Sequence, residues 1–270
     1  MAESKPKKRI VLTLGGKGGT GKTLFNRTLY YYLMSQGVKC LGYDADVENP
    51  EFAGYHNAEQ KQIKLLNFLD VSSAKNLFTE IDSEKPDVVL IDLPGASGKD
   101  TREQIQRFDA FRLSDDLGYR LTVATVLNID YNTINSLQSM QDFCKDAVDY
   151  VAVKSQLWRQ SSGNDFTRWV ASQTRQQFLE FKGIEIELPV LELSVFDLIH
   201  EQNLSFFNIG KLPFGDKILA EAYLSRVLPE LNKAAAYLGL PAEVPKTKST
   251  KANGKAADPT KMPELLSNPS

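Results

Sequence analysis

The sequence predicts an α/β fold with a doubly wound, mostly parallel sheet flanked by helices. Two observations lead to this prediction. Short, almost continuously apolar runs alternate along the chain with stretches of helical periodicity. Such continuous runs are typical of strands that are buried on both faces, as they are in parallel sheets. With 270 residues and 42 % hydrophobic content, the chain can build one large α/β domain or two small ones.

The first strand and the first helix enclose a glycine-rich loop. Residues 10–14 form a short apolar run that is followed by glycines. Four apolar residues then recur at helical spacing before Gly37, namely Phe25, Leu29, Tyr32 and Leu33. We therefore expect a strand, a loop and a helix in that order.

Later segments continue the alternation. Residues 39–43 and 87–93 are apolar runs followed by Asp44 and by Pro94-Gly95, so both are expected to be buried parallel strands. Further strands are expected at 121–127, 150–153 and 184–191, and helices at 131–146, 166–181 and 216–238. This regular exchange of strands and helices is the reason for expecting a doubly wound sheet.

The net charge of -2 conceals two basic ends. Residues 1–9 carry four Lys or Arg against one Glu, and residues 246–270 carry five Lys against two acids. The middle is acidic, at about -8, which argues against a general DNA-binding surface but leaves a local basic patch open. Because the tail has no apolar period, we expect a basic extension (1–9), one domain (10–245) and a disordered lysine-rich tail (246–270).

Cysteine use and hydropathy indicate a cytoplasmic location. Cys40 and Cys144 form no CxxC pair and lie in apolar contexts, so both are expected to be buried thiols in a reducing compartment. No stretch approaches the ~18 apolar residues of a membrane span, and no apolar signal region follows the charged N-terminus. We expect neither membrane insertion nor export.

Residues 16–23 read GKGGTGKT directly between the first strand and the first helix. Backbone amides can converge on phosphate oxygens only where Cβ atoms do not crowd the loop, which accounts for its glycines. The helix N-terminus adds free amides and the positive end of its dipole. Lys22 is placed to neutralise the outer phosphates and Thr23 to coordinate Mg²⁺. The expected nucleotide-binding residues of this loop are Gly16, Lys17, Gly18, Gly19, Thr20, Gly21, Lys22 and Thr23.

A second lysine, Lys17, stands at the start of this loop. With it the sequence resembles the deviant Walker A P-loop ATPases of the ParA/MinD family. In that family the early lysine reaches across a dimer interface to the nucleotide of the other subunit. The resemblance implies an ATP-bound sandwich dimer in which Lys17 and Lys22 are catalytic residues.

The stretch Asp44-Ala45-Asp46 matches the D-x-D switch of the family in order and spacing. The resemblance implies that Asp46 is catalytic and orients the attacking water, and that Asp44 supports magnesium-bound water or the loop lysines. The family often continues with Pro-Gln, whereas residues 47–50 of this chain read VENP.

The stretch Asp92-Leu93-Pro94-Gly95 matches the Walker B strand and the switch that follows it. A carboxylate at the end of a buried strand beside a phosphate site usually holds magnesium through water, and the resemblance gives Asp92 that role. Gly95 is expected to present its amide near the γ-phosphate and to move when that group leaves. The expected metal-binding residues are therefore Thr23, Asp92 and Asp44.

The adenine site is less specific. Relatives often place an Asn after the strand that corresponds to 150–153, and this chain has Lys154 there. Base contacts are expected from Lys154 or from residues 188–192, where relatives commonly have a proline-containing loop. The choice of ATP over GTP rests on the resemblance and on the lack of a clear NKxD motif.

The resemblance is to the ParA-like branch, whose members position plasmids, chromosomes or protein assemblies and include proteins of conjugative plasmids. It implies a bacterial, dimerising ATPase that hydrolyses ATP slowly and is stimulated by a partner protein, with non-specific DNA binding and nucleoid association left open. No operator-binding helix-turn-helix precedes the first strand, and the tail has no apolar face for a membrane. Two alternatives stay open: an ATP-dependent small-molecule ligase or kinase, and a nucleotide-binding adaptor in conjugation.

Overall fold

The computed structural model describes residues 8–16, 18–57, 63–158 and 166–241. Lys17, most of the expected basic extension and the whole expected tail lie outside these residues. The first described strand begins at Lys8, and Arg9 beside it is buried and forms an ion pair with Asp149. These two residues of the stretch 1–9 therefore belong to the sheet.

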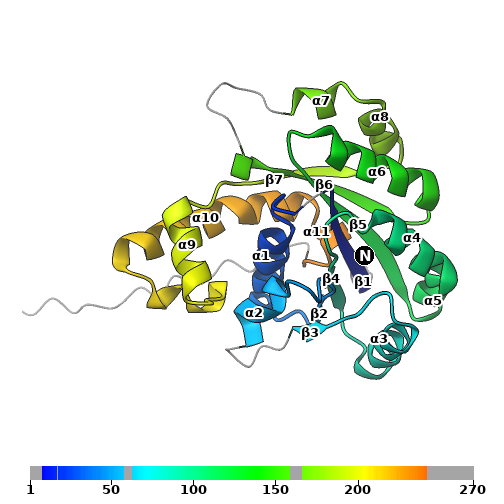
Figure 1. The fold of residues 1–270 in the computed structure, drawn as a ribbon, viewed down its shortest axis with the longest axis horizontal. Helices are drawn as coiled ribbons and strands as arrows, with labels where there is room; N and C mark the ends of the chain where they lie inside the picture. Colours follow the sequence, from blue (N-terminus) through cyan, green and yellow to red (C-terminus); the bar gives the residue numbers. More distant parts are fainter. Residues whose placement is uncertain (1–7, 17, 58–62, 159–165, 242–270) are drawn as a thin grey trace, which may run out of the picture.

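Within the described chain, seven strands form one sheet with every pairing parallel (Figure 1). They are β1 (Lys8–Gly15), β2 (Cys40–Asp44), β3 (Lys64–Leu65), β4 (Val88–Asp92), β5 (Tyr119–Leu127), β6 (Asp149–Ser155) and β7 (Ile184–Leu188). The spatial order is β3-β2-β4-β1-β5-β6-β7. The chain thus builds outward on both sides of β1, and ligands of such sheets bind at the carboxyl ends of the strands beside that switch point. The expected fold class is confirmed.

Helices cover both faces of this sheet (Figure 1). One face carries α1 (Lys22–Ser35), α2 (Glu51–Asn57), α9 (Leu193–Glu201), the 3-10 helix η2 (Phe206–Lys211), α10 (Phe214–Lys233) and α11 (Ala235–Leu238). The other carries α3 (Val71–Glu84), α4 (Gly98–Arg107), α5 (Ala110–Asp116), α6 (Tyr131–Cys144), α7 (Thr167–Val170) and α8 (Gln173–Glu180). A second 3-10 helix, η1 (Gln156–Trp158), follows β6.

Alternate residues of each strand supply the two halves of the core. Val11 and Leu90 pack under α1 and its neighbours, whereas Ile10 and Val89 pack under the helices of the opposite face. Successive side chains of a strand point to opposite faces, so strands covered on both sides must be apolar throughout. This explains why the strand sequences are continuously apolar.

Two expected helices are each interrupted. The stretch 166–181 contains α7 and α8, because the hydroxyl of Ser172 accepts a hydrogen bond from the Arg175 backbone N–H and starts a new helix there. The stretch 216–238 contains α10 and α11, which meet at Ala234. Short helices such as α2, α5 and α9 and the two-residue strand β3 carry too few residues to show a period in the sequence.

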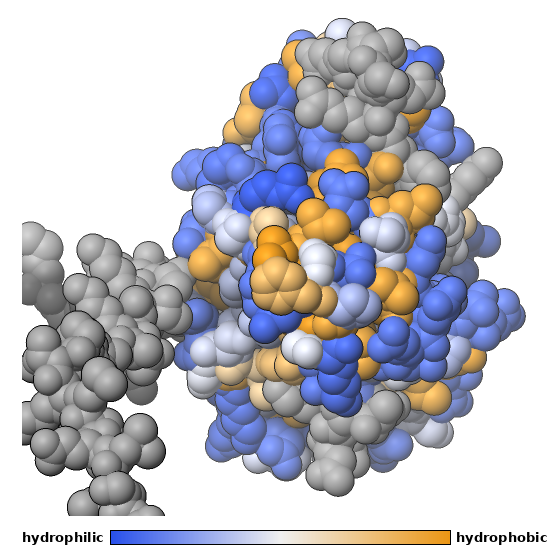
Figure 2. Space-filling model, turned by 90° about the vertical axis from the view of Figure 1, so that its left-hand side faces the viewer, coloured by the Kyte–Doolittle hydropathy of each residue, from blue (hydrophilic) through white to orange (hydrophobic). Residues whose placement is uncertain are grey.

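One side of the molecule presents exposed apolar residues. Leu193 on α9 and Phe214 and Ile218 on α10 are among the exposed large hydrophobic side chains. Figure 2 looks onto the side that carries these helices and shows hydrophobic residues spread among polar ones across the middle of the face. None of the helices in the described ranges combines the length and the apolar character that crossing a bilayer requires.

Candidate nucleotide-binding site

Three polar residues lie in one row across the carboxyl end of the sheet. Asp92 on β4 is the register partner of Asp44 on β2 and of Thr13 on β1. Paired residues of neighbouring strands point to the same face, and here that face is the one covered by α1. All three side chains are buried, so the sheet sets two carboxylates and a hydroxyl side by side beneath the helix.

The loop from β1 to α1 brings the lysine and the threonine of the GKT segment to this row. Gly21 has φ of +99°, a left-handed conformation that favours glycine, and α1 begins at the next residue. The Lys22 side chain is largely buried, and Thr23 Oγ1 donates a hydrogen bond to Asp92 Oδ2 at 2.9 Å. Thr23 of the loop therefore contacts Asp92, the carboxylate that is expected to hold magnesium through water.

Close approach also explains two glycines at the start of the loop. A Cβ on Gly15 would lie 2.7 Å from Thr20 Oγ1, and a Cβ on Gly16 would lie 3.0 Å from the backbone carbon of Asn132 on α6. The loop is thus held tightly at Gly15 and Gly16, between its own residues and α6, whereas a Cβ on Gly18 would enter open space. Lys17 lies outside the described residues, so its expected place at a dimer interface stays a prediction.

The buried carboxylates carry perturbed pKa values. Burial and the neighbouring Asp44 raise the pKa of Asp92 to about 7, although Lys22, Thr23 and Asn26 act in the opposite direction. Burial raises the pKa of Asp44 to about 6, against the lowering effect of the backbone N–H groups of Ala53 and Asp46. Two neighbouring carboxylates that resist ionisation together mark a place where a cation is favoured.

The segment after β2 is anchored to Asp44. Asp44 Oδ1 accepts a hydrogen bond from the Asp46 backbone N–H at 3.1 Å, and Asp44 Oδ2 accepts one from the Ala53 backbone N–H at 3.0 Å. Asp46 is half-buried, and its Oδ1 accepts a hydrogen bond from the Asn49 backbone N–H at 3.2 Å. The D-x-D segment is therefore a turn that joins the sheet to the start of α2, and the Asp46 side chain is partly exposed on this turn.

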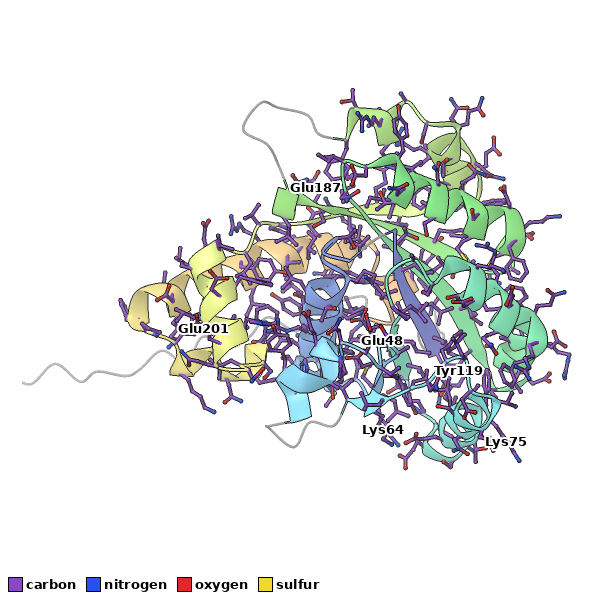
Figure 3. All side chains as sticks on the ribbon, viewed as in Figure 1. Glu48, Lys64, Lys75, Tyr119, Glu187 and Glu201 are labelled. Carbon is purple, nitrogen blue, oxygen red and sulfur yellow. The ribbon has the colours of Figure 1, made fainter. Side chains whose placement is uncertain are left out.

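A cavity of about 270 Å³ separates this turn from the loop that follows β4. Asp46 lines it on one side and Gly95 on the other, and Glu48, labelled in Figure 3, also borders it. Ala96 next to Gly95 has φ of +59°, a conformation uncommon for a residue with a side chain. The two expected switch segments thus face each other across open space.

Orphaned polar atoms test whether magnesium and phosphate fit the site. Asp92 Oδ1 and Thr20 Oγ1 are buried and have no hydrogen-bond partner within the described chain. Buried polar atoms are normally satisfied, so an unpaired hydroxyl and an unpaired carboxylate oxygen at this place fit a site that receives phosphate and a cation. The described residues contain no cluster of three or more His, Cys, Asp or Glu that would hold a metal unaided. Magnesium bound with a nucleotide needs only one or two carboxylates beside the phosphates, so this set fits it.

Lys154 is engaged by the neighbouring strand. Its Nζ lies 3.5 Å from Glu185 Oε2 and 3.3 Å from Glu187 Oε1, both on β7; Glu187 is labelled in Figure 3. The expected alternative base segment, 188–192, begins beside the loop, because a Cβ on Gly21 would lie 3.6 Å from Leu188 Cδ2. Either assignment of the adenine contact stays a prediction.

Three residues near the loop were missed at the sequence level. Ser155 and Leu157 would lie 3.1 Å and 2.8 Å from a Cβ on Gly21, and Asn26 is buried beneath α1 with its Oδ1 bonded to Thr13. The sequence does contain a signal for Asn26: it is a polar residue on the apolar side of the helix, four residues after Lys22. Nothing local marks the other two.

Comparison with known proteins identifies the family. The family model described as the CobQ/CobB/MinD/ParA nucleotide binding domain matches residues 11–205. The chain belongs to this family. The match spans the phosphate loop, the row of carboxylates and both expected switch segments, and the expected family is confirmed.

Two curated proteins and two solved structures are also similar to the chain. Protein MobD of Acidithiobacillus ferrooxidans is 23 % identical over 211 residues, covering 78 % of this chain and 90 % of its own length. Protein TraL of Escherichia coli is 27 % identical over 120 residues, covering 44 % of this chain and 50 % of its own. The MinC:MinD complex of Aquifex aeolicus matches with a TM-score of 0.49 at 16 % identity, over 82 % of this chain and 96 % of that one. An ADP complex of a nucleotide-binding protein from Archaeoglobus fulgidus matches with a TM-score of 0.48 at 16 % identity, over 74 % of this chain and 88 % of that one.

Proposed function

We propose that this member of the nucleotide-binding family is an ATP-dependent dimerising switch that positions or segregates plasmid DNA or a protein assembly. It hydrolyses ATP slowly alone and faster with a partner protein. The observation that carries the proposal is the hydrogen bond of Thr23 to Asp92, with Asp44 in register beside it. This arrangement is the one that a magnesium-dependent phosphate site requires.

The residues divide the work as follows. The loop amides and Lys22 would bind the phosphates, and Thr23 and Asp92 would hold Mg²⁺ with the support of Asp44. Mg²⁺ would neutralise charge on the outer phosphate oxygens. Asp46 stands at the rim of the cavity, where its carboxylate orients a water and accepts hydrogen bonds from it.

The two switch segments convert nucleotide state into shape. Gly95 would offer its amide to the γ-phosphate, and loss of that phosphate releases the loop after β4. Asp44 holds the other segment through the N–H groups of Asp46 and Ala53, so a movement of the Asp44 side chain would be passed to α2. Lys17 closes the dimer from the opposite subunit. The ATP-bound dimer binds its partner in the cytoplasm. If it also binds DNA, it associates with the nucleoid.

One observation favours a second candidate, an ATP-dependent small-molecule kinase or ligase. The cavity of about 270 Å³ between Asp46 and Gly95 has the size of a pocket for a small acceptor. In that case Asp46 takes a proton from the small molecule that receives the phosphoryl group, rather than positioning a water. ATP consumption that requires a small molecule would favour this candidate over the switch.

The test is light scattering coupled to size-exclusion chromatography on the Asp46→Ala variant, in ATP and in ADP, with and without a short DNA duplex. A dimer in ATP alone supports the switch, and co-elution with the duplex supports DNA positioning. A monomer in both nucleotides contradicts the dimerising switch and favours the small-molecule enzyme.

A further inference from the structure

Asn26 lies beside the row of Thr13, Asp92 and Asp44 at the carboxyl end of the sheet. It lies on α1 three residues after Thr23, and its side chain is fully buried. Its Oδ1 accepts a hydrogen bond from Thr13 Oγ1 at 2.7 Å. Thr13 is the register partner of Asp92, so the bond ties the Asn26 amide to the row that holds the Walker B carboxylate.

This bond orients the amide. Because Thr13 occupies the oxygen of the Asn26 side chain, the Nδ2 group is the end left for another partner. Within the described residues Asn26 Nδ2 has no hydrogen-bond acceptor, and Asp92 Oδ1 has no donor, although both atoms are buried. The Asn26 amide is also among the groups that favour the ionised form of Asp92, after Lys22 and Thr23. An unsatisfied donor and an unsatisfied acceptor therefore lie in the same buried cluster.

We propose that Asn26 is a positioning residue that holds the Asp92 carboxylate for Mg²⁺-nucleotide binding by donating its amide N–H to Oδ1. The inference rests on the proposed function. Thr23 already donates to Oδ2, so Asn26 on Oδ1 blocks rotation of the carboxylate. The carboxylate would then present a fixed edge to magnesium-bound water. In this proposal α1 has two roles: Lys22, its first residue, binds phosphate, and Asn26, one turn later, orients a metal ligand. Thr13 supports this role by fixing the direction of the amide.

The experiment measures how Mg²⁺ changes ADP affinity. Calorimetric titrations with ADP are made in EDTA and at a series of free Mg²⁺ concentrations, for the wild-type chain and for Asn26→Leu. Loss of an outer partner of a metal ligand commonly lowers metal affinity 10- to 100-fold. We expect Asn26→Leu to raise the Mg²⁺ midpoint about tenfold or more, with ADP affinity in EDTA nearly unchanged.

Two further variants separate positioning from packing. Thr13→Val keeps the shape of the core but frees the amide, and it should raise the Mg²⁺ midpoint less than Asn26→Leu does. Thr28→Val is the matched control: Thr28 is equally buried on α1, but its hydroxyl contacts Leu24 O and Tyr223 on the opposite side. It should lower stability without moving the Mg²⁺ midpoint.

Each outcome decides between the proposals. An unchanged Mg²⁺ midpoint in Asn26→Leu overturns the positioning role while leaving the phosphate site intact. If Asn26→Leu does not fold, Thr13→Val carries the test, and a midpoint equal to that of Thr28→Val overturns the role. A wild-type chain that binds no ADP, with or without Mg²⁺, overturns the proposed function and this inference together.

Discussion

Asp44 and Asp92 stand at the same register position on neighbouring strands, β2 and β4, and both are buried. The charge of Asp44 is, after burial, the second cause that raises the pKa of Asp92. The pair is costly in the protein alone, because ionising both places two like charges in one apolar layer. The folded state should therefore be stabilised most when a cation binds there together with the phosphates.

Stability without nucleotide should fall as the pH rises. The folded pKa of Asp92 is about 7 and that of Asp44 about 6, both above their unfolded values near 4. The folded chain therefore binds more protons in this interval, and the stabilising contribution is complete below pH 4 and lost by about pH 7. Asp92→Asn should flatten the decline and stabilise the chain at neutral pH by roughly 1 to 4 kcal/mol.

Urea unfolding at pH 5, 6, 7 and 8 measures this effect. Asp82→Asn is the control, because Asp82 is exposed on α3, which packs on the opposite face of the sheet. Equal slopes for the wild-type chain and Asp92→Asn would show that the carboxylate titrates normally. Mg²⁺ with ADP should remove much of the decline in the wild-type chain only.

Lys22→Ala should strongly weaken nucleotide binding. The Lys22 side chain is largely buried at the start of α1 and supplies the positive charge for the outer phosphates. Loss of hydrogen bonds to a charged group costs about 1.5–3 kcal/mol, so affinity should fall about 100-fold. Fluorescence titration with a labelled ADP measures it, with Lys39→Ala as the control because Lys39 is exposed and paired with Glu84. Retained affinity in Lys22→Ala would remove the phosphate-loop assignment.

Gly21→Ala should weaken both folding and nucleotide binding. Its φ of +99° is strained for alanine, and the new Cβ would lie 2.8 Å from Leu157 Cδ1. We expect a loss of about 1–3 kcal/mol in the free energy of unfolding. Gly54→Ala on α2 is the matched control, since its Cβ would enter open space and an alanine favours the helix. Thermal melts should separate the two variants, and a Gly21→Ala variant as stable as Gly54→Ala contradicts the loop geometry.

Removing residues 246–270 should leave folding and ATPase activity intact. The last residue of the core clusters within the described chain is Leu240. The segment carries five Lys against two acids, so any DNA binding should weaken about tenfold at low salt and lose salt dependence. Fluorescence anisotropy with a short duplex at two salt concentrations measures this. Loss of the folded state in the truncated chain would show that the tail belongs to the domain.

Local features of this protein can be predicted from its amino-acid sequence alone. The strand at residues 10–14, the glycines of the loop and the helix that starts at Lys22 follow one another along the chain, so period and composition identify them. Asp46 and Asp92 were selected because the segments Asp44-Ala45-Asp46 and Asp92-Leu93-Pro94-Gly95 resemble motifs of the family. Covalent neighbourhood is enough for such features, because the strand, turn and helix are formed by adjacent residues.

Contacts between residues that are far apart in the sequence depend on the tertiary fold. Strand order placed β4 between β2 and β1, and that order set Asp44, Asp92 and Thr13 in one row beneath Asn26. It also brought Lys154 against the acids of β7. These contacts depend on sheet register, which hydrogen bonds between strands and the burial of both faces select, and no period along one strand encodes it.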